Sequence, residues 1–360
     1  MQNLKVKVIG QGQLGQLMHT AGRKIGVEVL LQNPAEATDN IGSVLTTIES
    51  ESAIESPAYA ASQSDVINHR AHALIKDRLS QKELLSSLEL PVPNWCEVSE
   101  ASSLEALKDQ LGEKYILKYR QGGYDGKGQA PSDEVRSLEP WRGKAIAEAM
   151  VPFEQEVSII GARTHSGDIQ FYRLSENYHH KGVLQFSVSR NNRPLWLQER
   201  CEHMLSRVMH ELNYVGVMAM ECFVVDDQVL INELSPRVHN SGHWTLDGAA
   251  PSQFEAHLRA LLKLPLPAIE ERGDLLMVNL LGLEYQTQWL ETPGASLYWY
   301  QKALKPGRKM GHINISIKDQ QQIKNSLKKL QLPPEYSAGS IWLEELLTEG
   351  VAKAHFCEAS

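Results

Sequence analysis

The chain has 360 residues, of which 42% are hydrophobic, and its formal net charge at pH 7 is −8. This length allows roughly two or three domains with well-developed cores, and the acidic balance argues against a general nucleic-acid-binding protein. No signal peptide is recognisable, and no apolar run is long enough to cross a membrane. The four cysteines show no metal-binding spacing. They are typical of reduced thiols, so a cytoplasmic location is expected.

The N-terminal segment has the pattern of a β-α-β unit with a glycine-rich turn. A strand expected over residues 6–9 runs into the turn GQGQLG at 10–15, followed by a helix over 16–25 and a strand over 27–31. A G-x-G-x-x-G turn in this context is the sequence form of a dinucleotide site. However, no acidic residue ends the second strand. The turn therefore predicts either a nicotinamide or flavin site, or simply close packing of the strand against the helix.

A strand that ends in a lysine precedes a second glycine-rich segment. The strand is expected over residues 115–118, and residues 122–128 read GGYDGKG, with four glycines in seven positions. Backbone N–H groups of such a loop can approach phosphate oxygens closely, and lysines add positive charge. The G-K-[ST] ending of a Walker loop is missing. The segment predicts a phosphate-covering flap, with a surface hairpin as the alternative.

Two glutamates lie on an apolar hairpin expected over residues 217–234. If the turn consists of residues 226–228, Glu221 lies directly opposite Glu233. Like charges at such close positions are destabilising unless they share a proton or bind a cation. Mg²⁺ is a suitable cation, because it prefers carboxylate and phosphate oxygens. A register slip of one residue would instead place the glutamates on opposite faces, as solvated charges.

Two further segments carry candidate polar groups. His239 and His243 are four residues apart, a spacing that suits zinc on a helix, but the intervening Ser241-Gly242 favours a loop and no H-E-x-x-H motif is present. The C-terminal run KALKPGRKMGH at 302–312 is either a solvated turn or a grip for a phosphate group, for which arginine is well suited.

Five runs of the sequence, read in order, resemble one family of the ATP-grasp superfamily, the N5-carboxyaminoimidazole ribonucleotide synthetases. The runs are GQGQLGQL, GGYDGKGQ, YVGVMAMECF, NELSPRVHNSGHWT and KPGRKMGH. The resemblance covers almost the whole chain. It implies an α/β fold with an N-terminal doubly wound parallel-sheet domain (1–78), an ATP-grasp domain (79–265) and a small β-rich C-terminal domain (266–360).

The same resemblance implies an activity. The family joins bicarbonate to the amine of 5-aminoimidazole ribonucleotide, through carboxyphosphate, in purine biosynthesis. The implied cofactors are ATP and Mg²⁺, and the usual assembly is a homodimer. The alternatives are another ATP-grasp ligase, such as the formate-dependent glycinamide ribonucleotide enzyme or a biotin-dependent carboxylase, and a non-catalytic protein that senses dinucleotides. No biotin-accepting M-K-M segment is present.

The resemblance also assigns residues to each part of the site. The implied ATP contacts are Arg78, Lys118, Gly123, Tyr124, Asp125, Gly126, Lys127, Gly128, Gln129, Glu148, Ala149, Met150, Val151, Glu156, His179, Asn232 and Glu233. The ribonucleotide and bicarbonate contacts are Gln13, Leu14, Tyr124, Asp125, Lys127, Arg237, His239, Asn240, Ser241, Lys302 and Arg308. The metal ligands are Glu221, Glu233 and Asn240, and the catalytic residues are Lys118, Arg237 and His243.

One family pattern fits imperfectly. The family's T-x-E-x-E run matches Thr47 to Glu51 only after one inserted residue. Glu49 is therefore given no role, and an exposed acidic loop is the alternative for this segment. No residue can be named from the sequence as the base that accepts the proton of the amine.

Overall fold

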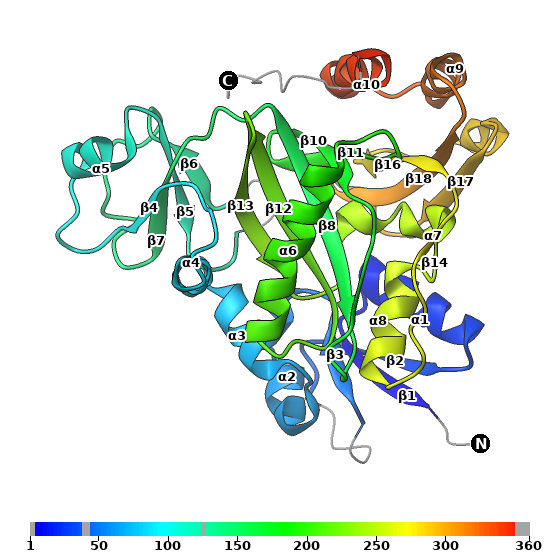
Figure 1. Ribbon diagram of the computed structural model, residues 1–360, viewed down its shortest axis with the longest axis horizontal. Helices are drawn as coiled ribbons and strands as arrows, with labels where there is room; N and C mark the ends of the chain where they lie inside the picture. Colours follow the sequence, from blue (N-terminus) through cyan, green and yellow to red (C-terminus); the bar gives the residue numbers. More distant parts are fainter. Residues whose placement is uncertain (1–3, 38–43, 124–126, 350–360) are drawn as a thin grey trace.

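In this computed structural model, the described part of the chain comprises residues 4–37, 44–123 and 127–349 (Figure 1). The chain begins with a parallel three-stranded sheet in the order β2-β1-β3. Its strands are β1 (Lys5–Ile9), β2 (Glu28–Gln32) and β3 (Thr46–Ile48). The helix α1 (Gln13–Lys24) begins inside the glycine turn, three residues before the predicted start, because the turn itself forms the first helical turn. The predicted parallel N-terminal unit is confirmed.

Three short helices lead from this sheet to a small antiparallel sheet. The helices are α2 (Pro57–Ser62), α3 (His69–Lys76) and α4 (Arg78–Ser87). Asp77 caps α4, since its side chain accepts a hydrogen bond from the backbone N–H of Leu79 at 2.9 Å. The small sheet has the order β4-β7-β5-β6 and is accompanied by α5. We call this part the small unit; its elements are β4 (Trp95–Glu97), α5 (Leu104–Leu111), β5 (Tyr115–Tyr119), β6 (Gln129–Pro131) and β7 (Ala145–Ala149).

A nine-stranded sheet forms the centre of the molecule, and its main path has the order β13-β12-β8-β10-β11-β16-β18-β17, with β9 paired to β8. We call it the large sheet. Its first strands, with the helices that follow them, are β8 (Gln155–Arg163), β9 (Ile169–Phe171), β10 (Ser175–His180), β11 (Val183–Ser189), α6 (Leu195–Glu211), β12 (Gly216–Val225), β13 (Gln228–Ser235), α7 (Thr245–Gly248) and α8 (Gln253–Leu261). In Figure 1, α6 lies across β8 and β12.

The C-terminal strands continue the large sheet. The predicted boundary at residue 265 does not interrupt it, because Phe186 on β11 pairs with Val278 on β16. The remaining elements are β14 (Ala249–Ala250), β15 (Glu270–Glu271), β16 (Asp274–Leu281), β17 (Ala295–Trp299), β18 (Lys309–Ile317), α9 (Gln320–Leu330) and α10 (Ser337–Glu349). In the described residues, no helix is both long and apolar enough to cross a membrane.

The N-terminal unit packs against the large sheet through one shared core. Val6, Met18 and Phe254 belong to the same buried cluster, which also includes strands of the large sheet. His257 fastens the two parts, since its Nδ1 accepts a hydrogen bond from the backbone N–H of Val217 at 2.9 Å and its Nε2 lies 3.1 Å from the Thr47 hydroxyl. This contact holds the chain that follows β3 beside the large sheet, where the cleft described below opens.

Candidate active site

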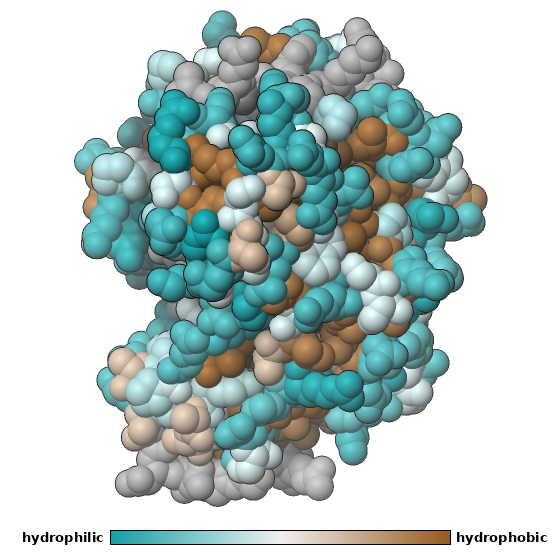
Figure 2. Space-filling view, turned by 90° about the vertical axis from the view of Figure 1, so that its left-hand side faces the viewer, coloured by the Kyte–Doolittle hydropathy of each residue, from teal (hydrophilic) through white to brown (hydrophobic). Residues whose placement is uncertain are grey.

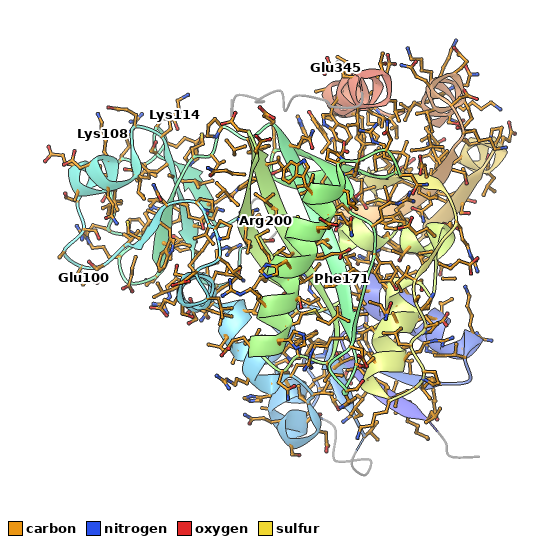
Figure 3. All side chains as sticks on the ribbon, viewed as in Figure 1. Glu100, Lys108, Lys114, Phe171, Arg200 and Glu345 are labelled. Atoms are coloured by element: carbon orange, nitrogen blue, oxygen red, sulfur yellow. The ribbon has the colours of Figure 1, made fainter. Side chains whose placement is uncertain are left out.

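A cleft of about 2560 Å³ lies where the small unit, the large sheet and the N-terminal glycine turn meet. Lys108 and Lys114, labelled in Figure 3, belong to the small unit and form part of its wall. The face of the molecule on the small unit's side is largely hydrophilic, with apolar patches between the polar side chains (Figure 2). The predicted residues that line the cleft are Gln13, Leu14, Arg78, Lys118, Gly123, Lys127, Gln129, Glu148, Ala149, Met150, Val151, Glu156, His179, Glu221, Asn232, Glu233, Arg237, His239 and Asn240.

The two hairpin glutamates face each other across β12 and β13. Glu221 pairs with Glu233, as predicted, but the predicted three-residue turn is wrong. Val225 pairs with Gln228, so the turn has two residues, and a bulge after Glu221 makes Asn232 the extra residue on β13. The bulge restores the glutamate pairing that the shorter turn would otherwise have shifted by one residue.

The surroundings of this pair suit a hard divalent cation. Burial raises the pKa of Glu221 to about 7, a shift that His179 opposes and the carboxylates of Glu233 and Glu156 reinforce. The buried Oδ1 of Asn240 has no hydrogen-bond partner among the described residues. Within the same residues, no three His, Cys, Asp or Glu side chains form a metal-binding group. Two carboxylates and one amide oxygen therefore fit Mg²⁺ completed by phosphate and water oxygens, but not a tetrahedral zinc site.

A buried carboxylate between two lysines connects the small unit to the hairpin. Lys118 on β5 and Lys82 on α4 contact different oxygens of Glu148, at 2.5 and 2.8 Å. Burial acts to raise the pKa of Glu148, but the two cations lower it to about 2. Lys118 also donates to Oδ1 of the bulge residue Asn232 at 3.2 Å. The strand lysine is thus held in place before any phosphate arrives.

Arg78 joins the glycine segment to the glutamate pair. Its guanidinium donates to the carbonyl oxygens of Tyr119 and Gly123, at 2.9 and 3.2 Å. The Nη2 atom also lies 3.7 Å from Oε2 of Glu233. The predicted ATP-contacting arginine therefore lies between the base of the predicted flap and a predicted metal ligand.

His179 and Glu156 form a second charged pair on the cleft wall. The ring Nδ1 of His179 lies 2.5 Å from a carboxylate oxygen of Glu156. Burial acts to lower the pKa of His179, but Glu156, together with Glu221 and Glu233, raises it to about 9. At neutral pH the imidazolium and the carboxylate therefore form an ion pair.

The ion pair of His179 with Glu156 predicts that the free energy of unfolding depends on pH. The pKa of His179 is about 9 in the folded protein and about 6.5 for an unperturbed histidine. The stabilisation is therefore complete below pH 6.5 and is lost as the pH rises through 9, with an upper bound of about 3 kcal/mol. Urea unfolding without Mg²⁺ or nucleotide should show this loss in the wild type but not in His179→Gln. Parallel pH curves for both proteins would contradict it.

The glycine turn of the N-terminal unit is filled by a side chain of the protein itself. The N–H groups of Gly12 and Gly15 donate to the two carboxylate oxygens of Glu49, at 2.8 and 2.7 Å. A Cβ atom on Gly10 would lie only 2.0 Å from the Glu49 side chain, so glycine is required there. Glu49 thus occupies the place that a dinucleotide pyrophosphate would need. The prediction of a dinucleotide site at residues 10–15 is therefore wrong. The alternative of an exposed acidic loop at residues 47–51 is wrong as well.

A second glutamate of the same loop contacts Arg237. The Nε of Arg237 donates to Glu51 at 2.9 Å, and Nη1 donates to the carbonyl oxygen of Val238 at 3.1 Å. Burial acts to lower the pKa of Arg237, but Glu51 outweighs it and the pKa is raised. Arg237 therefore stays cationic in the cleft, with its orientation fixed from the N-terminal unit.

Sequence and structure comparisons place these features in a family. Residues 83–254 match the ATP-grasp domain, and residues 276–326 match the phosphoribosylaminoimidazole carboxylase C-terminal domain. The N5-carboxyaminoimidazole ribonucleotide synthase of Escherichia coli is 42% identical over 350 residues, covering 94% of this chain and 98% of that protein. The chain belongs to the N5-carboxyaminoimidazole ribonucleotide synthases. It is therefore an ATP-grasp ligase.

Solved structures of this synthase family have the same fold. The Thermus thermophilus enzyme superimposes with a TM-score of 0.80 at 32% identity, covering 91% of this chain and 99% of that one. The Aspergillus clavatus enzyme, solved with ADP and 5-aminoimidazole ribonucleotide, has a TM-score of 0.77 at 26% identity and covers 94% of this chain and 100% of that one.

Two residues predicted from the synthase resemblance lie behind the cleft instead of in its wall. His243 and Ser241 are both fully buried and do not line the cleft. The ring of His243 packs against that of His312, with the centroids 4.6 Å apart, and burial holds its pKa well below the usual value. The predicted contact of His243 with bicarbonate stays a prediction; in this structure the ring packs against His312 behind the cleft lining.

The neighbouring His239, unlike His243, has its side chain in the cleft wall. It lines the cleft, its Nε2 lies 3.7 Å from Glu221, and its Nδ1 lies 2.9 Å from the Ser241 hydroxyl. Gln253 fixes the loop by accepting from the His239 N–H and donating to its carbonyl oxygen. A Cβ atom on Gly242 would lie 2.2 Å from Ile160, so the loop can fold back this closely only with glycine there.

The basic C-terminal run lies at the margin of the cleft. Lys302 donates to the side chain of Gln13, which lines the cleft, whereas Arg308 donates to the carbonyl oxygen of Ala303 in its own loop. Neither cation lines the cleft in this structure, and Gly128 also lies outside its lining. Lys309, which received no role from the sequence, does line it.

Three residues of the predicted glycine-rich flap lie outside the described residues, namely Tyr124, Asp125 and Gly126. The sequence also gave Lys82 no role, although it is only 2% exposed. Its position four residues after Arg78, on the inner side of an amphipathic helix, is a weak signal, since buried lysines are rare unless paired.

Proposed function

We propose that Glu221, Glu233 and Asn240 hold Mg²⁺ while the chain carries out the reaction of its family. That reaction is the ATP- and bicarbonate-dependent carboxylation of 5-aminoimidazole ribonucleotide to N5-carboxyaminoimidazole ribonucleotide, in purine biosynthesis. The observation that carries the metal assignment is the register of Glu221 against Glu233 in the cleft, whose lining also includes Asn240. A metal ion held by these residues would supply positive charge for phosphoryl transfer.

Residues of the small unit, with Arg78 on α4 and Glu156 on β8, then hold ATP. Lys118 lines the cleft, is already fixed by Glu148 and Asn232, and would offer its ammonium to a phosphate oxygen. The strand end Ala149-Met150-Val151 lines the cleft and offers backbone groups to adenine, and Glu156 offers a carboxylate to the ribose. Arg78 and the glycine segment would cover the phosphates and limit access of water to carboxyphosphate.

Arg237 orients bicarbonate, an assignment supported by its position. Bicarbonate is a weak electrophile towards an amine at neutral pH, and phosphorylation by ATP gives it a leaving group. A fixed guanidinium can hold one carboxylate-like oxygen pair by two parallel hydrogen bonds. Since Glu51 and the Val238 carbonyl already bind Nε and Nη1, the outer edge of the guanidinium is the part offered to the anion.

The amine-bearing ribonucleotide would lie between Arg237 and the N-terminal turn. Gln13 and Leu14 line the cleft there, with Lys309 from the C-terminal strand also in its wall. The formate-using alternative is not favoured, because relatives similar over nearly the whole chain, in sequence and in structure, are synthases of N5-carboxyaminoimidazole ribonucleotide. Homodimerisation and a cytoplasmic location stay predictions, and sedimentation of the pure protein would test the first.

The decisive experiment is phosphate release by the pure protein. ATP hydrolysis should require bicarbonate and be stimulated by 5-aminoimidazole ribonucleotide. Omitting Mg²⁺ should abolish the hydrolysis of ATP and its stimulation by the ribonucleotide. Activity with formate and glycinamide ribonucleotide instead would move the chain to the neighbouring ligase family.

The basic run supplies a test of the ribonucleotide site. The substrate's 5′-phosphate is a dianion, and loss of a charge-assisted hydrogen bond costs about 1.5–3 kcal/mol, roughly ten- to a hundredfold in affinity. Lys302→Ala and Arg308→Ala are each expected to raise the KM for the ribonucleotide by about that factor, and to leave the KM for ATP unchanged. Lys305→Ala, an exposed cation of the same loop, is the matched control. If neither Lys302→Ala nor Arg308→Ala changes the KM for the ribonucleotide, the run is a solvated turn and not a phosphate site.

A further inference from the structure

The helix α4 lies beside β13, the terminal strand in the order of the large sheet. Its side chains bind the backbone of that strand. The Gln81 carboxamide accepts from the Leu234 N–H at 3.0 Å, and Lys82 donates to the carbonyl oxygens of Asn232 and Ile231 at 3.1 and 3.5 Å. These contacts act on the residues at and next to the bulge, and on both sides of Glu233.

Lys82 has an unusual environment for a lysine. Its side chain is 2% exposed, and its ammonium contacts Glu148 on β7 at 2.8 Å as well as the two carbonyl oxygens on β13. It does not line the cleft. A single buried cation thus joins three segments, the helix α4, the small unit and the bulged strand, without facing ATP or the ribonucleotide.

We propose that Lys82 is a positioning residue that holds the bulge at Asn232 and thereby keeps Glu233 opposite Glu221 for metal binding. The inference deepens the proposed function and rests on its metal assignment. Without the bulge, the two-residue turn would place Asn232 where Glu233 now pairs, since the register would shift by one residue. The bulge leaves backbone groups outside the ladder, and Lys82 is the donor that satisfies the carbonyl oxygen of the extra residue.

The same cation links the two halves of the site. Lys82 holds one oxygen of Glu148, which leaves the other oxygen to Lys118. Lys118 in turn contacts the Asn232 side chain, so both faces of the bulge residue, backbone and amide, are tied to one carboxylate. A displacement of Lys82 would therefore move the metal ligand and the phosphate-binding lysine together.

The test is the Mg²⁺ dependence of Lys82→Met. Methionine has a similar length and no charge, and Glu148 keeps its ion pair with Lys118, so no buried charge is left alone. The Kd for Mg²⁺, measured by calorimetry in the presence of ADP, and the Mg²⁺ concentration for half-maximal activity at saturating ATP are both expected to rise about tenfold or more. The KM for the ribonucleotide is expected to change by less than about twofold, because its contacts lie elsewhere in the cleft.

The matched control is Lys7→Met. Lys7 is also buried, at 6% exposure, and its ammonium donates to the Ser62 hydroxyl in the N-terminal unit. The Lys7→Met variant should have a lower thermal stability than the wild type and the same Mg²⁺ dependence of activity. An unchanged Mg²⁺ dependence in Lys82→Met would overturn the inference, as would a parallel rise of the Mg²⁺ and ribonucleotide constants. If Lys82→Met does not fold, Lys82→Gln keeps one donor and should shift the Mg²⁺ dependence in the same direction.

Glu233→Gln, measured alongside, separates two kinds of failure. A shifted Mg²⁺ dependence in Glu233→Gln with a normal one in Lys82→Met would refute the positioning role alone. If neither variant shifts, the metal assignment is wrong and the role of Lys82 falls with it.

Discussion

Replacing Glu233 by glutamine is expected to lower ATP turnover by about a hundredfold or more. The substitution keeps the size of the side chain and removes one ligand charge from the pair with Glu221. A metal ion that neutralises transferring phosphoryl oxygens is worth several kcal/mol, and about 1.4 kcal/mol corresponds to a tenfold change in rate. Removing the charge should also relieve the repulsion between the carboxylates, so the folded protein should be no less stable.

The measurement is phosphate release at several Mg²⁺ concentrations, with the folded state checked by urea unfolding. Asp227→Asn is the matched control, because it removes one carboxylate from the exposed turn of the same hairpin. It should leave turnover unchanged. Turnover near the wild-type value in Glu233→Gln at ordinary Mg²⁺ concentrations would refute Glu233 as a ligand. A smaller loss in Glu221→Gln is compatible with two inequivalent ligands.

The hairpin of β12 and β13 shows which parts of the metal site could be predicted from the sequence. Alternating apolar residues and two glutamates were enough to predict their pairing, but the predicted turn was one residue too long. The observed pairing depends on the bulge at Asn232, and the bulge is satisfied by Lys82 and Lys118, which are 150 and 114 residues away in the chain. Local propensity carries no information about such partners.

The prediction of a dinucleotide site at the N-terminal glycine turn was wrong for a related reason. A glycine turn before a helix offers N–H groups to an anion, and the pattern alone cannot say which anion. Here it is Glu49, brought in by the parallel pairing of β1 with β3. In the loop after β13, the sequence shows that His243 has the residue type of a catalytic group. It does not show that the ring packs against Phe254 and His312, because only the tertiary fold creates these contacts.

The domain boundary predicted at residue 265 lies between α8 (Gln253–Leu261) and β16 (Asp274–Leu281). The pairing of β11 with β16 nevertheless makes one sheet of both parts. Strand pairing over about ninety residues follows from shared burial on one face, which a pass along the sequence does not reveal.

Replacing Arg237 by methionine is expected to reduce kcat/KM for bicarbonate by about a hundredfold or more. The guanidinium is one of the cations that line the cleft, and it is held by Glu51 and the Val238 carbonyl. A charge-assisted hydrogen bond to an anion contributes about 1.5–3 kcal/mol. Two such bonds, both strengthened as charge develops on the phosphorylated intermediate, account for the expected loss. ADP binding, measured by calorimetry, should change by less than about twofold, because Arg237 is not among the residues expected to contact the nucleotide.

Arg259→Met is the control for loss of an arginine ion pair. Arg259 contacts Glu255 on the same helix at 2.6 Å and lies outside the cleft lining. It should leave the bicarbonate dependence unchanged. Glu51→Gln should weaken bicarbonate use less than Arg237→Met does, since it loosens the orientation of the guanidinium without removing its charge. If Arg237→Met weakens ADP binding and leaves the bicarbonate dependence intact, Arg237 belongs to the nucleotide site. Bicarbonate would then have to be oriented by another cation of the cleft, of which Lys309 is the first to test.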